Sequence, residues 1–220
     1  SRCGAISPMS KGPEMHPVLA AYVGDFTRTG AVPADAAALL RSRGREDTAD
    51  HCQRVAAMAQ RLARRWEVDD RSAEIAGWLH DISAIVPWDD HLQVAEMLGV
   101  KVLEEERQAP VLVHQKLSAV IAQEVLAIVD GPVLEAIGCH TTLRADSSPL
   151  DKVVFVADKI AWDQAGDPPY LAAVAGAVDR SLDLAAYYYL DYLRHKHKAM
   201  HPWAAQAYRQ LADRVRQEPG

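Results

Sequence analysis

Helical spacing of apolar residues, which recurs along most of the chain, constrains the fold more than any other sequence feature. Between residues 48 and 66 one stripe has steps of four, three and four, formed by Val55, Ala59, Leu62 and Trp66. This spacing places the stripe on one face of an amphipathic helix, and Thr48 is its expected N-cap. Alternating β-branched residues, which are typical of strands, are not found. We therefore predict an all-α fold.

Proline, glycine and aspartate clusters divide the remaining chain into further helices. We expect helices over residues 72–82, 88–98, 115–129, 133–140 and 150–162, a long helical stretch ending at 200, and a last helix over 202–216. Residues 1–14 are rich in Gly, Ser and Pro, and we expect them to be disordered. Residues 15–220 are expected to form one globular domain, a helical bundle with a C-terminal helical extension.

Composition excludes several classes of protein. The 220 residues include 24 Lys and Arg against 30 Asp and Glu, a net charge of −6 without a basic block, which argues against a nucleic-acid partner. No apolar run reaches the ~18 residues of a membrane span. The three cysteines show no CxxC spacing. We therefore expect a cytoplasmic protein without a membrane or nucleic-acid partner.

Six polar residues lie on the apolar faces or at the ends of these predicted helices. They are His51, His80, Asp81, His114, His140 and Asp158. Each alone is more often a hydrogen-bonded core residue than a ligand. Together they are costly to bury, because every unsatisfied polar group costs about 1–3 kcal/mol and a charge costs more. Divalent cations satisfy all six, and imidazole with carboxylate suits Fe, Mn, Zn or Ni.

The same residues carry a family resemblance. The run 79–82, Leu-His-Asp-Ile, with His51 upstream resembles the HD-domain superfamily of metal-dependent phosphohydrolases. The family's ligand order, His, His-Asp, His, His, Asp, is met by all six residues. Segments 109–114, 133–142 and 150–158 resemble the YqeK-type branch, which hydrolyses dinucleoside tetraphosphates symmetrically to nucleoside diphosphates. The resemblance covers about residues 45–162.

This resemblance implies a site with two metal ions bridged by the carboxylate of Asp81. We expect iron, with Mn, Co, Ni or Zn as alternatives, and neutral imidazoles as ligands. Two divalent ions and two carboxylates leave a site near +2. Such a pair lowers the pKa of a bridging water, so a hydroxide held at Asp81 is the expected nucleophile and no side-chain nucleophile is predicted.

The phosphate-binding residues depart from the family's usual pattern. Residues 82–85 lack the Lys that often follows the His-Asp pair, and no Arg follows Asp158 until Arg180. Thr141 and Lys152 are candidate substrate-binding residues. The alternatives are that Thr141 ends a helix and that Lys152 is solvated. Asp158 could instead pair with Lys152 or Lys159.

Two other functions stay open at this point. The same ligand set can bind two irons that activate oxygen, which would make the chain an HD-type di-iron oxygenase. A non-catalytic nucleotide-binding module is ranked last, because all six ligands are present. The aromatic residues 187–192 are typical of a core or of a homodimer interface, and His91 is expected at the surface.

Overall fold

The protein is all-α over the residues that its computed structural model describes, which are 15–162, 166, 168–197 and 199–217. No strand occurs in these ranges, so the predicted fold class is confirmed. The α-helices are α1 (Pro17–Val23), α2 (Val32–Ser42), α3 (Glu46–Arg65), α4 (Asp70–Leu79), α5 (His91–Met97), α6 (Glu104–Gln108), α7 (His114–Glu124), α8 (Gly131–Cys139), α9 (Pro149–Ile160), α10 (Leu171–Ala177), α11 (Leu182–Lys196) and α12 (Pro202–Gln217). Short 3₁₀ helices cover Ile82–Ile85, Trp88–Asp90 and Pro110–Val113. Residues 1–14, for which disorder is predicted, lie outside the described ranges. The predicted domain division stays a prediction.

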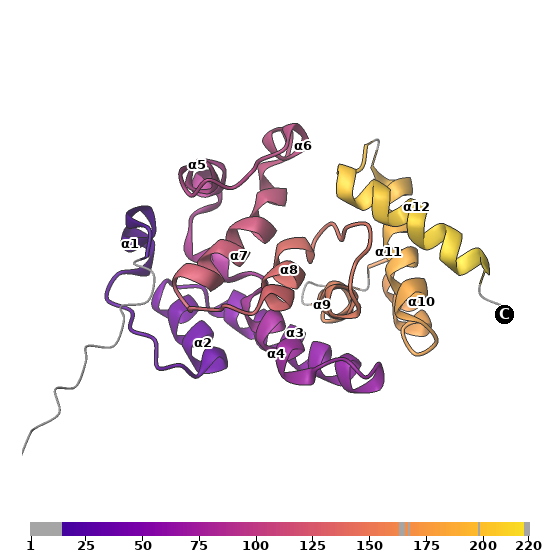
Figure 1. Ribbon diagram of the computed structural model, residues 1–220, viewed down its shortest axis with the longest axis horizontal. Helices are drawn as coiled ribbons and strands as arrows, with labels where there is room; N and C mark the ends of the chain where they lie inside the picture. The colour runs from indigo at the N-terminus through magenta and orange to yellow at the C-terminus, as the bar shows by residue number, and fades with distance from the viewer. Residues whose placement is uncertain (1–14, 163–165, 167, 198, 218–220) are drawn as a thin grey trace, which may run out of the picture.

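Helices α3 and α4 pack against each other, and Gly77 makes their approach tight. A Cβ atom at Gly77 would lie only 2.6 Å from the Cα atom of Ala56 in α3. This contact brings the N-terminal half of α3 next to the C-terminal end of α4, where His51 and His80 lie. In Figure 1, α9 lies between the α3–α4 pair and the α10–α12 group, so that α9 contacts both.

Local capping explains several helix boundaries. Ser148 caps α9 by accepting a hydrogen bond from the backbone N–H of Asp151, and the Asp151 carboxylate accepts one from the Ser148 N–H, which forms a capping box. The predicted N-cap at Thr48 is wrong, because α3 already begins at Glu46. The predicted long stretch ending at residue 200 is interrupted after α10, and Ser181 caps α11.

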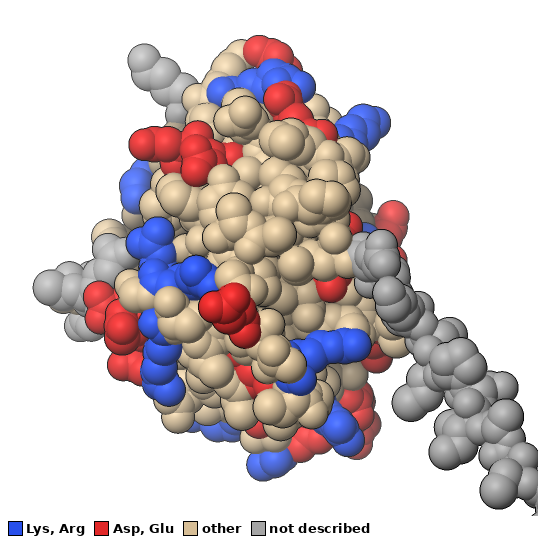
Figure 2. Space-filling model, turned by 90° about the vertical axis from the view of Figure 1, so that its left-hand side faces the viewer, with Lys and Arg blue, Asp and Glu red and all other residues tan. Residues whose placement is uncertain are grey.

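The apolar faces of the helices form one continuous core. Leu79, Ile121, Ile137 and Phe155 are among its fully buried side chains. No described helix combines the length and the apolar character that crossing a membrane requires. On the face shown in Figure 2, basic and acidic side chains are interspersed around a broad uncharged area.

Candidate metal centre

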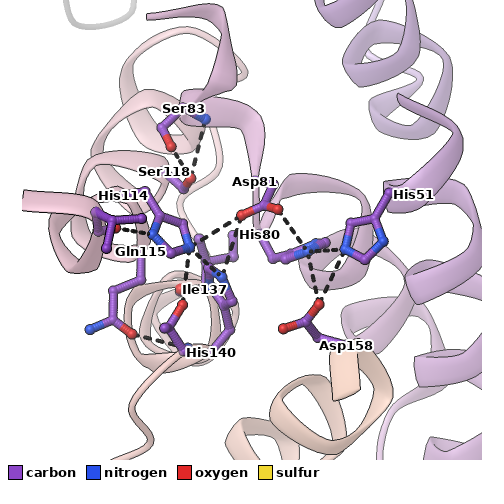
Figure 3. A network of polar contacts seen from close by, with 12 residues as sticks. His51, His80, Asp81, Ser83, His114, Gln115, Ser118, Ile137, His140 and Asp158 are labelled. Carbon is purple, nitrogen blue, oxygen red and sulfur yellow. Dashed lines mark hydrogen bonds and ion pairs between the residues drawn. The ribbon is translucent and has the colours of Figure 1, made fainter. Parts of the chain in front are cut away.

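All six residues of the predicted ligand set converge on one place in the fold. Figure 3 shows them facing a common centre, with Asp81 between two groups of side chains. Four come from helix ends, where His80 follows α4, Asp81 follows His80, His114 begins α7 and His140 follows α8. His51 and Asp158 instead project from within α3 and α9. The structure thus brings together residues up to 107 positions apart.

Three of the histidines are held in the same way by their own backbone. The Nδ1 atom of His80 lies 2.8 Å from the carbonyl oxygen of Gly77, and that of His140 lies 2.8 Å from the carbonyl of Ile137. His114 makes the equivalent bond to Val111. A carbonyl only accepts hydrogen bonds, so Nδ1 carries the proton in each ring. In a neutral ring of this tautomer Nε2 carries the lone pair that a metal ion accepts, and in all three residues Nε2 faces the centre.

These Nε2 atoms approach one another in pairs at hydrogen-bonding distance. The Nε2 atoms of His114 and His140 are 3.0 Å apart, and those of His51 and His80 are 3.2 Å apart. Burial, followed by the neighbouring imidazoles, lowers the pKa of His140 to about 4, so its ring is neutral at pH 7. Two neutral rings that both donate from Nδ1 cannot hydrogen-bond through Nε2. A positive ion between the lone pairs removes this conflict, so the donor set fits a metal.

Asp81 lies between the two groups of imidazoles. Its Oδ1 is 3.4 Å from the Nε2 atoms of both His114 and His140, and its Oδ2 is 3.4 Å from Nε2 of His80. Oδ1 is buried and has no hydrogen-bond partner. A buried carboxylate oxygen without a hydrogen-bond partner, placed beside two imidazoles, would suit a bound cation. One carboxylate thus faces both halves of the centre.

Asp158 completes the half of the centre that contains His51 and His80. Its Oδ1 lies 3.2 Å from Nε2 of His51 and 3.6 Å from Nε2 of His80. Its Oδ2 accepts a hydrogen bond from the ammonium group of Lys159. Among the described residues, ligand atoms close enough for one ion form two overlapping groups: His51, His80 and Asp158, and His80, Asp81 and His140.

The electrostatics of the centre favour ionised carboxylates. Burial by itself raises the pKa of Asp81, but the imidazoles around it outweigh this effect and hold that pKa well below its ordinary value. The pKa of Asp158 is likewise lowered, because Lys159 and the histidines outweigh burial. In turn, burial opposes the charge on Lys159, but Asp158 raises the pKa of that ammonium group. Both carboxylates are therefore anionic near neutral pH and available to a cation.

A cavity of about 310 Å³ opens directly onto the centre. His51, Asp81 and Asp158 line its floor, and Lys159 lines it beside them. Its wall is aromatic, because Trp162, Tyr170 and Tyr189 also line it. The sequence indicates Lys159 only as a possible ion-pair partner of Asp158. The packing of α9 against α11 also places Lys159 beside the cavity. The spacing of residues in the sequence does not predict this location.

The turn after His140 is organised by Gln115, a role that the sequence pattern does not predict. The Gln115 side-chain oxygen accepts hydrogen bonds from the backbone N–H groups of Thr141 at 3.1 Å and Thr142 at 3.2 Å. This places the hydroxyl of Thr141, a predicted substrate-binding residue, 3.0 Å from Nε2 of His114. The only available signal for Gln115 was its position next to His114 in the sequence.

Lys152 and His91 lie outside the ligand cluster. The ammonium group of Lys152, the other candidate for substrate binding, pairs with Asp183 at the start of α11. The surface position expected for His91 is wrong, because the residue is fully buried and its Nε2 bonds the carbonyl oxygens of Ser83 and Val86. His91 therefore fastens the loop that follows the His80–Asp81 pair.

Comparison with known proteins places the chain in a family. The family model of the HD domain matches residues 48–163. A protein of Lactococcus lactis subsp. cremoris, described as an uncharacterized protein in the pepC 5' region, is 38% identical over 149 residues, which are 67% of this chain and 76% of that protein. The symmetrical bis(5'-nucleosyl)-tetraphosphatase of Bacillus subtilis is 30% identical over 128 residues, 57% of this chain and 67% of that enzyme.

A solved structure shares the fold. It is described as a predicted HD superfamily hydrolase involved in NAD metabolism, from Clostridium acetobutylicum. It superposes with a TM-score of 0.75 at 26% identity, covering 82% of this chain and 97% of that one. The family match spans more than half of the chain and contains all six residues of the centre. The chain therefore belongs to the HD domain family and is a hydrolase.

Proposed function

We propose that this hydrolase cleaves a phosphoanhydride bond of a nucleotide, namely the central bond of a dinucleoside tetraphosphate, which yields two nucleoside diphosphates. One observation carries the proposal: Asp81 faces two sets of imidazole lone pairs at the floor of a cavity with an aromatic wall. The cation site suits phosphate oxygens, and the aromatic rings suit a nucleobase. The names of the relatives in Bacillus subtilis and Staphylococcus aureus, both symmetrical tetraphosphatases, support this substrate.

The six ligands would hold two divalent ions, with iron as the first expectation and Mn, Co, Ni or Zn as alternatives. When bound, such ions supply charge that stabilises phosphoryl oxygens and acidifies a water molecule. The chain's own residues then position the substrate. The ammonium group of Lys159 lies at the cavity and can donate to a phosphate oxygen, and the hydroxyl of Thr141 can donate from the opposite half. Lys159 thereby offers the cation that residues 82–85 lack.

No side-chain nucleophile is needed for this reaction. Cys52 and Cys139 are both buried, and burial raises the pKa of each thiol, so neither supplies a thiolate near neutral pH. In the reaction, the bond between the bridging oxygen and one central phosphorus breaks, and water supplies the oxygen that replaces it. Each product then carries two phosphates.

The test begins with the number of metal ions per chain. The protein, loaded in turn with Fe, Mn or Co, is incubated with diadenosine tetraphosphate, and the products are separated by chromatography. ADP as the sole product is expected. His114→Ala should abolish turnover, whereas His195→Ala, which removes a solvent-exposed histidine of α11, should leave it intact.

Two outcomes would count against the proposal. Unequal products, AMP with ATP, would reject symmetrical cleavage. Oxygen consumption with an organic substrate and no phosphate chemistry would instead favour the di-iron oxygenase. The hydrolase names of the relatives favour the phosphohydrolase over that alternative.

A further inference from the structure

A second cavity borders the centre from the side of Thr141. Its volume is about 350 Å³, and it lies between the 3₁₀ helix Pro110–Val113, the turn after α8, α11 and the start of α12. Most of its lining is apolar: Val111, Leu112, Leu193, Met200 and Ala204. The first cavity is lined instead by the carboxylates, by Lys159 and by aromatic rings. The two cavities thus differ in chemistry but are similar in size.

The two cavities border different halves of the centre. The first contacts His51 and Asp158 directly. The second reaches the other half through Thr141, whose hydroxyl oxygen is 3.0 Å from Nε2 of His114. Tyr189 lines both cavities, so the two are neighbours. A ligand that passes over Asp81 can therefore extend into a cavity at each end.

The second cavity suits a planar base. Its apolar side chains match the faces of a nucleobase, and the buried Thr142 and His201 add a small number of polar groups, as is usual in ligand sites. Both ring nitrogens of His201 are already engaged, Nε2 with Glu106 at 3.2 Å and Nδ1 with the backbone N–H of Trp203 at 3.2 Å. These bonds fix the ring of His201, so that it lines the cavity in one orientation.

We propose that this second cavity binds the nucleoside of one half of the substrate while the first cavity binds the other half. The inference rests on the proposed function. A dinucleoside tetraphosphate carries one nucleoside at each end and its scissile bond in the middle. A cation centre with a nucleoside cavity on each side places that central bond at Asp81. The two-sided arrangement thereby selects symmetrical cleavage and selects substrates with two nucleosides.

The experiment compares diadenosine tetraphosphate with adenosine 5'-tetraphosphate, which has the same number of phosphates but one nucleoside. Because apolar contacts discriminate by about tenfold or more, kcat/KM for the wild type should favour the two-nucleoside substrate by at least roughly that factor. Ala199→Trp adds bulk at the exposed edge of the second cavity, and this preference should then fall toward one. Val129→Trp, at a side chain that is 91% exposed and lines neither cavity, is the matched control and should keep the wild-type preference.

Each outcome decides the inference. A preference unchanged in Ala199→Trp, with metal content and thermal unfolding like those of the wild type, would overturn it. If Ala199→Trp does not fold, Leu193→Ala removes an apolar contact from the same cavity and should lower the same preference. A wild type that hydrolyses both substrates equally would overturn the second nucleoside site but leave phosphoanhydride hydrolysis standing. A wild type that hydrolyses neither would overturn the proposed function and this inference with it.

Discussion

Replacing Asp81 with asparagine tests whether one carboxylate serves both halves of the centre. The substitution keeps the shape of the side chain and removes its charge. Oδ1 faces His114 and His140, whereas Oδ2 faces His80. Asp81→Asn should therefore weaken both metal sites at once. His51→Ala removes a residue that faces only one half, so this control variant should lose one ion and keep the other.

The magnitude follows from binding linkage. With free metal about 100-fold above its Kd, each ion stabilises the folded chain by about 2.7 kcal/mol, and two ions by about 5.4 kcal/mol. For a chain of this size each kcal/mol corresponds to roughly 2–4 °C, so saturating metal should raise the Tm of the wild type by about 10–20 °C. Asp81→Asn should lose most of this increase.

The assay is thermal unfolding with and without EDTA, combined with metal analysis of the purified chain. Expected values are two ions per chain for the wild type, one for His51→Ala and none for Asp81→Asn. If Asp81→Asn retains two ions and the full metal-dependent rise in Tm, the carboxylate does not bridge the two halves and the reasoning fails.

Three further predictions follow from individual contacts. Gly77→Ala should destabilise the chain by about 1–3 kcal/mol in urea unfolding, because its Cβ would collide with α3, whereas Gly176→Ala, at a position with open space, should not. Asp35 accepts hydrogen bonds at 2.7–3.0 Å that, against the effect of burial, lower its pKa. The stabilisation is thus present above about pH 4 and lost as pH falls through the lowered pKa, so Asp35→Asn should cost about 1–2 kcal/mol at pH 7 and progressively less below pH 4. Lys159→Met should lower kcat/KM for the tetraphosphate about tenfold or more with unchanged metal content, since a charge-assisted bond to phosphate is lost; equal kinetics would exclude that contact.

Local sequence determined most of the helices and the identity of the chemical groups. The stripe from Val55 to Trp66 predicted α3, and Ser148 marked the start of α9, because amphipathic periodicity and capping depend on residues within a few positions of each other. The same local patterns predicted six polar side chains on apolar faces. Their burial implied partners without showing which atoms would meet.

Tertiary packing decided the arrangement of those atoms and the cavities around them. The sequence does not show that Asp81 directs one oxygen to each half of the centre, that Lys159 lines the first cavity, or that Tyr189 lines both. These positions depend on how α9 and α11 pack against helices that are distant along the chain. Lys152 and Lys159 are seven positions apart on the same helix, yet one pairs with Asp183 and the other with Asp158. The direction of a side chain relative to another helix is set by packing, so only the folded chain determined which lysine reaches the centre.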